Sequence, residues 1–385
     1  MKIAIIGTVG VPGCYGGFET LAENLVRHHD AAERPEELTV YCSARAYPER
    51  SPTYLSARLR YSRLDANGPQ SIVYDAVSLA DAARRGTDAI VVLGVSGAVA
   101  LPLVRLLSRS RIVTNIDGIE WRREKWQGLA RRFLRWSERL AVRFSHEVVA
   151  DNQAIADYVR DTYGVAAQVI EYGGDHAVQV PPAETVGVAL PPGYALALCR
   201  IEPENNVGLI LDAFARSGRP LVFVGNWDKS DYGRSLRARH AGAPNLHLLD
   251  PIYEEGRLRR VRADAALYVH GHSAGGTNPS LVEMMHFGIP ILAFDCVFNR
   301  HTTEGAAHYF EDAEALARLT SALPDDALQA NADAMRSIAA RRYTWDRISR
   351  SYFDLLAGPV QGRVEQSVRH GAAGSGAHSL LGKAR

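Results

Sequence analysis

The sequence predicts an α/β protein built from two doubly wound, Rossmann-like domains, and three observations support this. Short runs rich in isoleucine and valine alternate with amphipathic helical patterns almost from end to end. Two such series flank residues 173–193, where glycine and proline concentrate and periodicity is lost. The 385 residues suffice for two domains, and 46% hydrophobic and 23% charged residues are typical of a soluble globular protein.

The predicted strands are short apolar runs. In the first half they are residues 2–6, 38–42, 89–93, 111–115, 147–150 and 168–172, and in the second half 194–199, 220–224, 246–249, 265–269 and 291–294. Strands that are apolar on both faces and separated by helices are typical of parallel sheets covered on both sides. Each half is therefore expected to form one doubly wound sheet.

Domain limits follow from the interruption between the two series. We expect a first domain over residues 1–178 and a second over 179–342, followed by a last helix over 343–357. The remaining residues, 358–385, are too small and polar to pack and are expected to form a disordered tail.

Composition excludes several classes of protein. With a net charge of +1, the chain does not produce the overall positive potential expected of a nucleic-acid-binding protein. The four cysteines show no C-x-x-C spacing, which favours free thiols in a reducing cytoplasm over zinc or disulfides. No signal-peptide pattern is visible, and the longest uncharged stretch, 89–104, is shorter than the ~18–20 residues of a spanning helix.

The segment 270–280 interrupts the second series with small polar residues directly after a predicted strand. Ligands of open parallel sheets bind beyond the carboxyl ends of the strands. Asn278 and Pro279 predict a helix start, and Gly288 with Pro290 predicts its end. A phosphate is expected at this start, next to Gly275 and Gly276 and facing the N–H groups of Ser280, Leu281 and Val282.

Glu283 lies one turn into this helix. Its carboxylate can accept hydrogen bonds from two neighbouring sugar hydroxyls. It can equally serve only the helix dipole, an effect of typically ~0.3–1 kcal/mol. The motif alone leaves both interpretations open.

A second glycine-rich loop follows the first strand, with glycines at 7, 10, 13, 16 and 17. The spacing is not that of a dinucleotide fingerprint, and no carboxylate ends the second strand to hold a ribose. The G-K-[ST] of a P-loop is also missing. A tight turn explains one or two glycines, whereas five predict a loop that a sugar or diphosphate can approach closely, with Gly16 and Gly17 nearest the helix.

Several segments together resemble glycosyltransferase family 4, retaining enzymes of the GT-B fold, and more narrowly bacterial rhamnosyltransferases that extend polysaccharide repeat units. The resemblance covers roughly residues 1–357. It is carried by IIGTVGVPGCYGGFET, NIDGIEWRREKWQGLARRFLRWSERLAVRF, ADNQAI, IEYGGD, CRIEPENN and HGHSAGGTNPSLVE.

This resemblance implies two domains facing a central cleft, a nucleotide-sugar donor on the second domain, an acceptor on the first, and neither metal nor cofactor. The last helix would cross back to the first domain. Arg200 matches the arginine that faces the donor diphosphate, and Glu283 matches the second glutamate of the E-x7-E pattern, which holds the donor ribose. The first glutamate is replaced by Gly275 and the usual lysine by Asn205, so contacts to the sugar ring are expected to differ.

Sugar transfer builds negative charge on the departing diphosphate, so preorganised hydrogen-bond donors should contribute most to catalysis. The candidate catalytic residues are Asp117, Arg200 and Glu283. Asp117 either orients or deprotonates an acceptor hydroxyl or caps the following helix, and Glu120 competes for the acceptor role. The expected donor site comprises Gly16, Gly17, Arg200, His272, Gly275, Gly276, Thr277, Asn278, Ser280, Leu281 and Glu283.

His270 and His272 lie two residues apart, but no third ligand is evident, so we expect a hydrogen bond from His272 to the donor rather than a metal site.

Residues 121–143 carry eight basic and two acidic side chains, a local charge of +6. An apolar stripe follows helical spacing through Trp126, Leu129, Phe133, Trp136, Leu140 and Phe144. A core-packed amphipathic helix explains the stripe but not the sign of the charge. We therefore expect peripheral contact with an anionic membrane surface, where a lipid-linked acceptor would be presented.

The function expected from these features is transfer of rhamnose from dTDP-rhamnose to a saccharide acceptor during cell-surface polysaccharide synthesis, in the cytoplasm at the inner face of the membrane. No nucleic acid is expected as a partner. Two alternatives remain: a nucleotide-sugar epimerase of the same architecture, and a non-catalytic nucleotide-sugar binding module.

Overall fold

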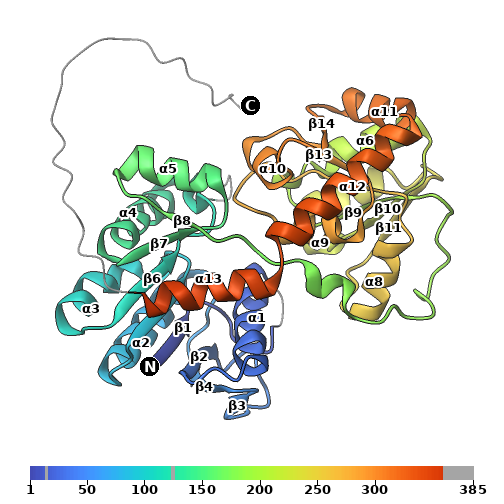
Figure 1. Cartoon of the computed structure of the whole chain (residues 1–385). Helices are drawn as coiled ribbons and strands as arrows, with labels where there is room; N and C mark the ends of the chain where they lie inside the picture. The colour runs from blue at the N-terminus through green and yellow to red at the C-terminus, as the bar shows by residue number, and fades with distance from the viewer. Residues whose placement is uncertain (14–15, 123–125, 359–385) are drawn as a thin grey trace, which may run out of the picture.

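The computed structural model describes residues 1–13, 16–122 and 126–358, and it contains two α/β domains (Figure 1). The strands of the first domain are β1 Lys2–Ile6, β2 Glu37–Ser43, β3 Thr53–Tyr54, β4 Ala57–Ser62, β5 Ala89–Leu93, β6 Arg111–Asn115, β7 Glu147–Ala150 and β8 Gln168–Val169. Its helices are α1 Gly17–Ala31, α2 Ser71–Arg84, α3 Leu101–Leu107, α4 Gly128–Phe144 and α5 Gln153–Tyr163.

The second domain has its own strands, β9 Ala195–Leu198, β10 Leu221–Val224, β11 Leu246–Leu249, β12 Leu267–His270, β13 Ile291–Phe294 and β14 His308–Phe310. Its helices are α6 Val207–Ser217, α7 Asp231–Arg239, α8 Glu255–Ala263, α9 Pro279–Phe287, α10 Val297–Thr302, α11 Ala313–Ala322 and α12 Asp325–Arg342. A last helix, α13 Trp345–Ala357, follows α12.

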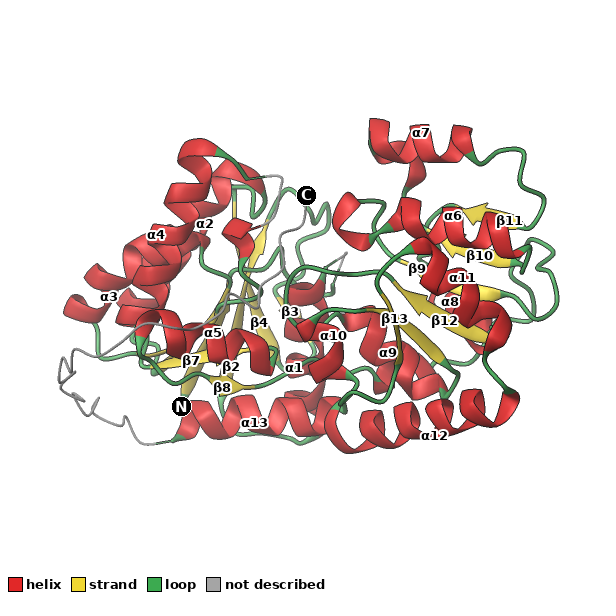
Figure 2. Ribbon diagram, turned by 90° about the horizontal axis from the view of Figure 1, so that it is seen from above, coloured by secondary structure: helices red, strands yellow, loops and turns green. Residues whose placement is uncertain are grey.

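Each domain is a sheet with helices on both faces (Figure 2). The first sheet has the order β3-β4-β2-β1-β5-β6-β7-β8 and the second β11-β10-β9-β12-β13-β14. All described pairings are parallel except the β3–β4 hairpin. The predicted fold class of two doubly wound domains is confirmed.

The strands that the sequence failed to predict lie at or next to sheet edges. β4 pairs with β2 near one edge of the first sheet, and its sequence ARLRYS alternates apolar with basic residues instead of forming an apolar run. β14 is a three-residue strand at the edge of the second sheet. Short or half-polar edge strands lack the continuous hydrophobic pattern of central ones.

Helix α13 leaves the second domain and lies along the first (Figures 1 and 2). The Asn115 side chain, at the end of β6, donates a hydrogen bond of 2.7 Å to the hydroxyl of Tyr352 on α13. The ring of Phe353 packs against His28 and His29 of α1, and the guanidinium of Arg34 lies 4.3 Å from its centroid. These contacts connect α13 to the first domain.

The structure also bears on membrane-spanning helices and on the tail. No helix among the described residues is long and apolar enough to cross a membrane. The tail expected to be disordered, 358–385, lies outside the described residues except for Gly358.

A buried carboxyl group in the first domain gives a prediction about stability. Asp75 of α2 is 3% exposed and accepts a hydrogen bond from the hydroxyl of Ser96. Burial raises the pKa of Asp75 to about 7, although hydrogen bonds from Ser96 and the Gly97 N–H oppose the shift. Because the folded-state pKa exceeds the unfolded value, the folded protein binds the proton more tightly, and stability falls as pH rises from about 4 to about 7.

Asp75→Asn is expected to remove this loss, since the amide resembles the protonated acid in shape and carries no charge. Urea unfolding at pH 5 and pH 8 should show the wild type losing more than about 1 kcal/mol relative to the variant. Equal pH dependence of the two proteins would contradict the prediction.

Candidate functional site

The two domains touch through the loops that follow β6 and β12, at the carboxyl ends of their strands. A Cβ atom built on Gly118 would lie 2.7 Å from the Cα of Gly275, and one on Gly276 would lie 1.7 Å from Oδ1 of Asp151. Distances below about 3 Å are not tolerated between such atoms, so the approach requires glycine on both sides. Gly275 also has a φ of 107°, which a glutamate would rarely adopt. The departure from E-x7-E at this position therefore has a structural reason.

Asn152 ties the two domains together at the same place. Its Oδ1 accepts from the Ala154 N–H at 3.0 Å, as the N-cap of α5. Its Nδ2 lies 3.1 Å from Oγ1 of Thr277, and 3.3 Å from both the carbonyl of Phe298 and Oγ1 of Thr302. A single buried amide thus links α5 to the loop before α9 and to helix α10.

Asp151, directly before Asn152, is 1% exposed, and its Oδ1 has no hydrogen-bond partner among the described residues. Burial, and after it the charge of Asp117, raise the pKa of Asp151 well above its usual range, against a hydrogen bond from the Thr277 backbone. These surroundings therefore favour the protonated form of this carboxyl group.

Asp117 lies next to this contact, in a turn with a φ of 59°. Its N–H donates to Oδ1 of Asn115 at 2.9 Å, and Asn115 is in turn hydrogen-bonded to Tyr352. A non-glycine residue with positive φ is uncommon and is held by its surroundings. Glu120 instead accepts a hydrogen bond of 2.8 Å from the indole of Trp126, within its own loop. Of these two residues, Asp117 is the direct chain neighbour of Gly118, which approaches Gly275.

The glycine-rich loop of the first domain faces the start of α9. A Cβ atom on Gly17 would lie 3.5 Å from the Tyr172 hydroxyl and 3.6 Å from Cγ of Pro279. Glu19 stabilises the loop, since its Oε1 accepts from the Thr8 hydroxyl at 3.0 Å and from the Val9 N–H at 2.8 Å. The two glycine-rich segments singled out in the sequence therefore border the same space.

Helix α9 begins and ends as predicted. Oδ1 of Asn278 accepts from the Ser280 N–H at 3.0 Å, and Gly288 ends the helix in the left-handed conformation. The N–H groups of Leu281 and Val282 donate to the carbonyl of Asn278 at 3.1 and 3.3 Å. The prediction that these three N–H groups are free for a phosphate is therefore wrong, because Asn278 accepts from all of them.

Glu283 is buried, with 9% of its surface exposed, and it belongs to an ion-pair cluster. A glutamate that served only the helix dipole would not need such partners. Its Oε2 accepts from the Arg262 guanidinium of α8, and its Oε1 lies 3.4 Å from Nε2 of His176. Burial raises the pKa of Glu283, but Arg262 and His176 lower it by more, so the net shift is downward. The carboxylate is charged and ready to accept hydrogen bonds. Nδ1 of His176 accepts from the indole of Trp345, which connects this cluster to α13.

Arg200 follows β9 and is partly exposed, with its Nη1 3.6 Å from Oε1 of Glu202. The backbone carbonyl of Arg200 accepts from Nδ2 of Asn205 at 2.8 Å. Oδ1 of Asn205 lies 2.7 Å from Nδ1 of His272. Asn205, which stands where a lysine was expected, thus joins Arg200 to the loop after β12. His272 is oriented by this bond, and its backbone carbonyl accepts from Nδ2 of Asn299 at 2.8 Å.

Comparison with known proteins agrees with this architecture. A family model described as "Domain of unknown function (DUF1972)" matches residues 1–175. Among curated proteins no match is found. Among solved structures, sucrose-phosphate synthase (tll1590) from Thermosynechococcus elongatus is similar with a TM-score of 0.75 and 15% identity, over 92% of this chain and 98% of that one.

Two other solved structures are similar over comparable lengths. Anabaena Alr3699/HepE in complex with UDP-glucose has a TM-score of 0.68 and 16% identity, over 92% of this chain and 99% of that one. The OtsA apo structure has a TM-score of 0.68 and 8% identity, over 93% and 99%. The chain has the GT-B fold. At these identities, the likeness concerns architecture rather than substrate.

Prediction from the sequence did not identify several residues at the contact between the two domains. Asp151 and Asn152 directly follow β7 within the ADNQAI motif, and a carboxylate after a buried strand was the signal that could have identified them. Arg262 carried no such signal, because it lies in a helix with other arginines and only packing shows that it pairs with Glu283. Among the described residues, no group of three histidine, cysteine or acidic side chains is placed to hold a metal.

Proposed function

We propose that this protein is a retaining glycosyltransferase that moves rhamnose from dTDP-rhamnose onto a saccharide acceptor, carried on a lipid, in cell-surface polysaccharide synthesis. The observation that supports this most is the glycine-to-glycine approach of the loops after β6 and β12. It brings Asp117 of the first domain to the loop that leads into α9. The fold adds support, since one similar GT-B structure holds UDP-glucose.

In this proposal Arg200 faces the donor diphosphate and stabilises the negative charge that develops as the sugar leaves. Glu283 accepts hydrogen bonds from the donor ribose, for which its charged state is suited. His272, held by Asn205, donates to the donor. Asp117 orients the acceptor hydroxyl. Gly16 and Gly17 allow the donor to approach the first domain, and neither metal nor cofactor takes part.

The sugar is proposed from the residue at position 275. A glutamate there would contact hydroxyl groups of the transferred sugar in the family that the sequence resembles, whereas Gly275 offers only backbone. A deoxysugar such as rhamnose has fewer hydroxyl groups and needs fewer such contacts.

Product analysis tests the proposal against its two alternatives. The protein is incubated with radiolabelled dTDP-rhamnose, with and without a panel of saccharide acceptors, and the products are separated. Transfer requires an acceptor and releases dTDP. An epimerase would change the nucleotide sugar with no acceptor present. A binding module would show affinity with no turnover on any acceptor, and either of these results would contradict the proposal.

The proposed location is the cytoplasm, with peripheral contact of residues 121–143 at the inner face of the membrane. Residues 123–125 of this segment lie outside the described residues, and α4 covers residues 128–143 of it. Flotation with neutral and with anionic vesicles tests the contact, which predicts binding only to the anionic ones.

A further inference from the structure

Helix α4 does not pack as an ordinary amphipathic helix. Its buried residues are Ser137, Glu138, Ala141 and Val142, whereas Leu129 is 82% and Trp136 52% exposed. A core-packed helix, the alternative explanation of the apolar stripe, therefore does not account for these two residues. Small side chains face the domain because α4 lies close to the turn after β5, where Ser137 donates to the Val95 carbonyl. Large apolar side chains are left at the surface.

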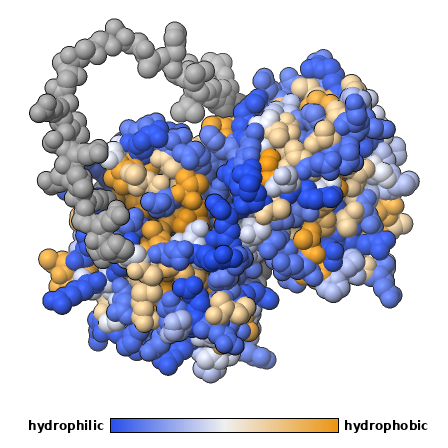
Figure 3. Space-filling view, viewed as in Figure 1, coloured by the Kyte–Doolittle hydropathy of each residue, from blue (hydrophilic) through white to orange (hydrophobic). Residues whose placement is uncertain are grey.

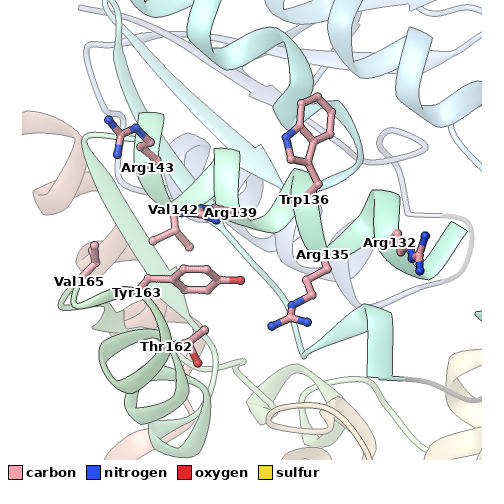
Figure 4. Close-up of a pocket in the computed structure, with 9 residues that line it drawn as sticks. All are labelled: Arg132, Arg135, Trp136, Arg139, Val142, Arg143, Thr162, Tyr163 and Val165. Carbon is pink, nitrogen blue, oxygen red and sulfur yellow. The ribbon is translucent and has the colours of Figure 1, made fainter. Parts of the chain in front are cut away.

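A groove runs between α4 and the end of α5 (Figure 4). Glu138 of α4 joins the two helices beside it, since its Oε1 accepts from the hydroxyls of Tyr158 at 2.7 Å and Tyr163 at 2.6 Å, both on α5. The cavity measures about 540 Å³. Its lining residues are Arg132, Arg135, Trp136, Arg139, Val142, Arg143, Thr162, Tyr163 and Val165.

The charge of this groove is one-sided. Its lining contains four arginines and no carboxylate, and the four are exposed. Across the described part of the chain, no ion pair joins Arg132, Arg135 or Arg139 to a carboxylate, whereas Arg27 of α1 and Arg160 of α5 each have one. The carboxylate of Glu138, on the same helix, accepts hydrogen bonds from two tyrosines instead of pairing with these arginines. Guanidinium groups match phosphate oxygens with paired hydrogen bonds, so the groove is complementary to a phosphate group.

Exposed apolar side chains also lie on α3, the helix that contacts α4. Leu103, Leu106 and Leu107 of α3 are 60%, 79% and 72% exposed. Helix α3 contacts α4, and Figure 3 shows hydrophobic side chains at the surface over α3, at the left edge of the molecule. Soluble proteins rarely gather so many exposed leucines without a partner. A lipid with a phosphate headgroup offers an anion beside acyl chains, which is the arrangement of arginines beside leucines seen here.

We infer that the α4–α5 groove binds the phosphate headgroup of an anionic lipid, while Trp136 and the α3 leucines enter the adjoining interfacial layer. This inference rests on the proposed membrane contact and adds a discrete site to it. It does not depend on glycosyl transfer, because the groove shares no residue with the proposed donor or acceptor site.

The test uses the full chain and vesicles of phosphatidylcholine, alone or mixed with phosphatidic acid. The wild type should sediment with the mixed vesicles. Arg135→Glu combined with Arg139→Glu is expected to weaken this binding by at least about tenfold, since each basic residue near an anionic surface contributes appreciably. The matched control, Arg84→Glu with Arg216→Glu, changes the net charge equally at exposed helical arginines outside the groove and should stay within about twofold of wild type.

Competition separates a phosphate site from diffuse attraction. Inorganic pyrophosphate should release the wild type from mixed vesicles at lower ionic strength than sodium chloride does, whereas equal release would overturn the discrete site. A third outcome is that the wild type binds pyrophosphate, the groove variant does not, and the wild type fails to bind vesicles. That result would overturn the lipid headgroup as the ligand of the groove. Leu106→Ser with Leu107→Ser should reduce vesicle binding several-fold and leave pyrophosphate binding unchanged. If the control variant weakens binding as much as the groove variant, the inference is wrong.

Nucleotide binding and transfer to a soluble acceptor keep the two proposals apart. Both activities should be the same in the groove variant and the wild type. If the groove variant both binds vesicles normally and transfers sugar, only the inferred lipid site is overturned. If the wild type fails to transfer sugar, the proposed function is overturned.

Discussion

Arg200→Ala is expected to lower kcat for sugar transfer by about 10²–10³-fold, the effect typical of removing one preorganised donor at a developing negative charge. Stability should change little, because the ion pair with Glu202 joins two side chains that are 36% and 38% exposed. The loss should fall mainly on kcat and less on KM, since the diphosphate charge grows toward the transition state. Steady-state kinetics with the nucleotide sugar and a saccharide acceptor measure both parameters.

Two variants serve as controls for this prediction. Arg200→Lys keeps the charge but loses the paired hydrogen bonds and should recover only part of the rate. Arg216→Ala removes an exposed arginine of α6 and should retain full activity. A kcat for Arg200→Ala within about threefold of wild type would be far below the expected effect and would remove Arg200 from the proposed mechanism.

Gly276→Ala is expected to reduce kcat/KM by about 10²-fold, because a displacement of the order of 1 Å between reacting groups has that effect. The added Cβ would lie 1.7 Å from Oδ1 of Asp151, so the loop before α9 must move away from the first domain. Each domain retains its own core, and most of the stability should persist. Kinetics together with thermal unfolding distinguish a displaced loop from a misfolded protein.

Gly242→Ala is the matched control, because a Cβ atom there meets nothing within 4 Å. It should keep wild-type activity. Full activity of Gly276→Ala would mean that the approach of the two loops does not matter for function.

Sequence reasoning succeeded where a pattern reports a local preference. Apolar runs gave the central strands of both sheets, and Asn278, Pro279 and Gly288 gave the limits of α9, because capping is decided by neighbouring residues. Strand β4, next to an edge, and the edge strand β14 were missed because strands at these positions need no continuous apolar run. Resemblance to a known family added the GT-B architecture, which no single segment of the sequence establishes.

The candidate site was harder to predict, because its geometry depends on contacts between distant segments. The N–H groups of α9 were expected to be free, yet the Asn278 side chain and carbonyl accept from them. Asn205 was noted only as a departure from a family pattern, although it connects Arg200 to His272. The partner of Glu283, Arg262, is one of several arginines in α8, and spacing does not distinguish it from the others.

Nucleotide binding by wild type and Glu283→Gln tests the central claim, a nucleotide-sugar site at the contact of the two domains, most directly. Thermal unfolding is followed with dTDP, UDP, GDP and NAD, and each shift is taken relative to the same protein without ligand, since the variant also loses its charged partner for Arg262. A nucleotide at 100 times its Kd should stabilise the wild type by about 2.7 kcal/mol. The proposal predicts that dTDP gives the largest shift and that the shift is smaller in Glu283→Gln. Stabilisation by NAD alone, or by no nucleotide, would contradict it.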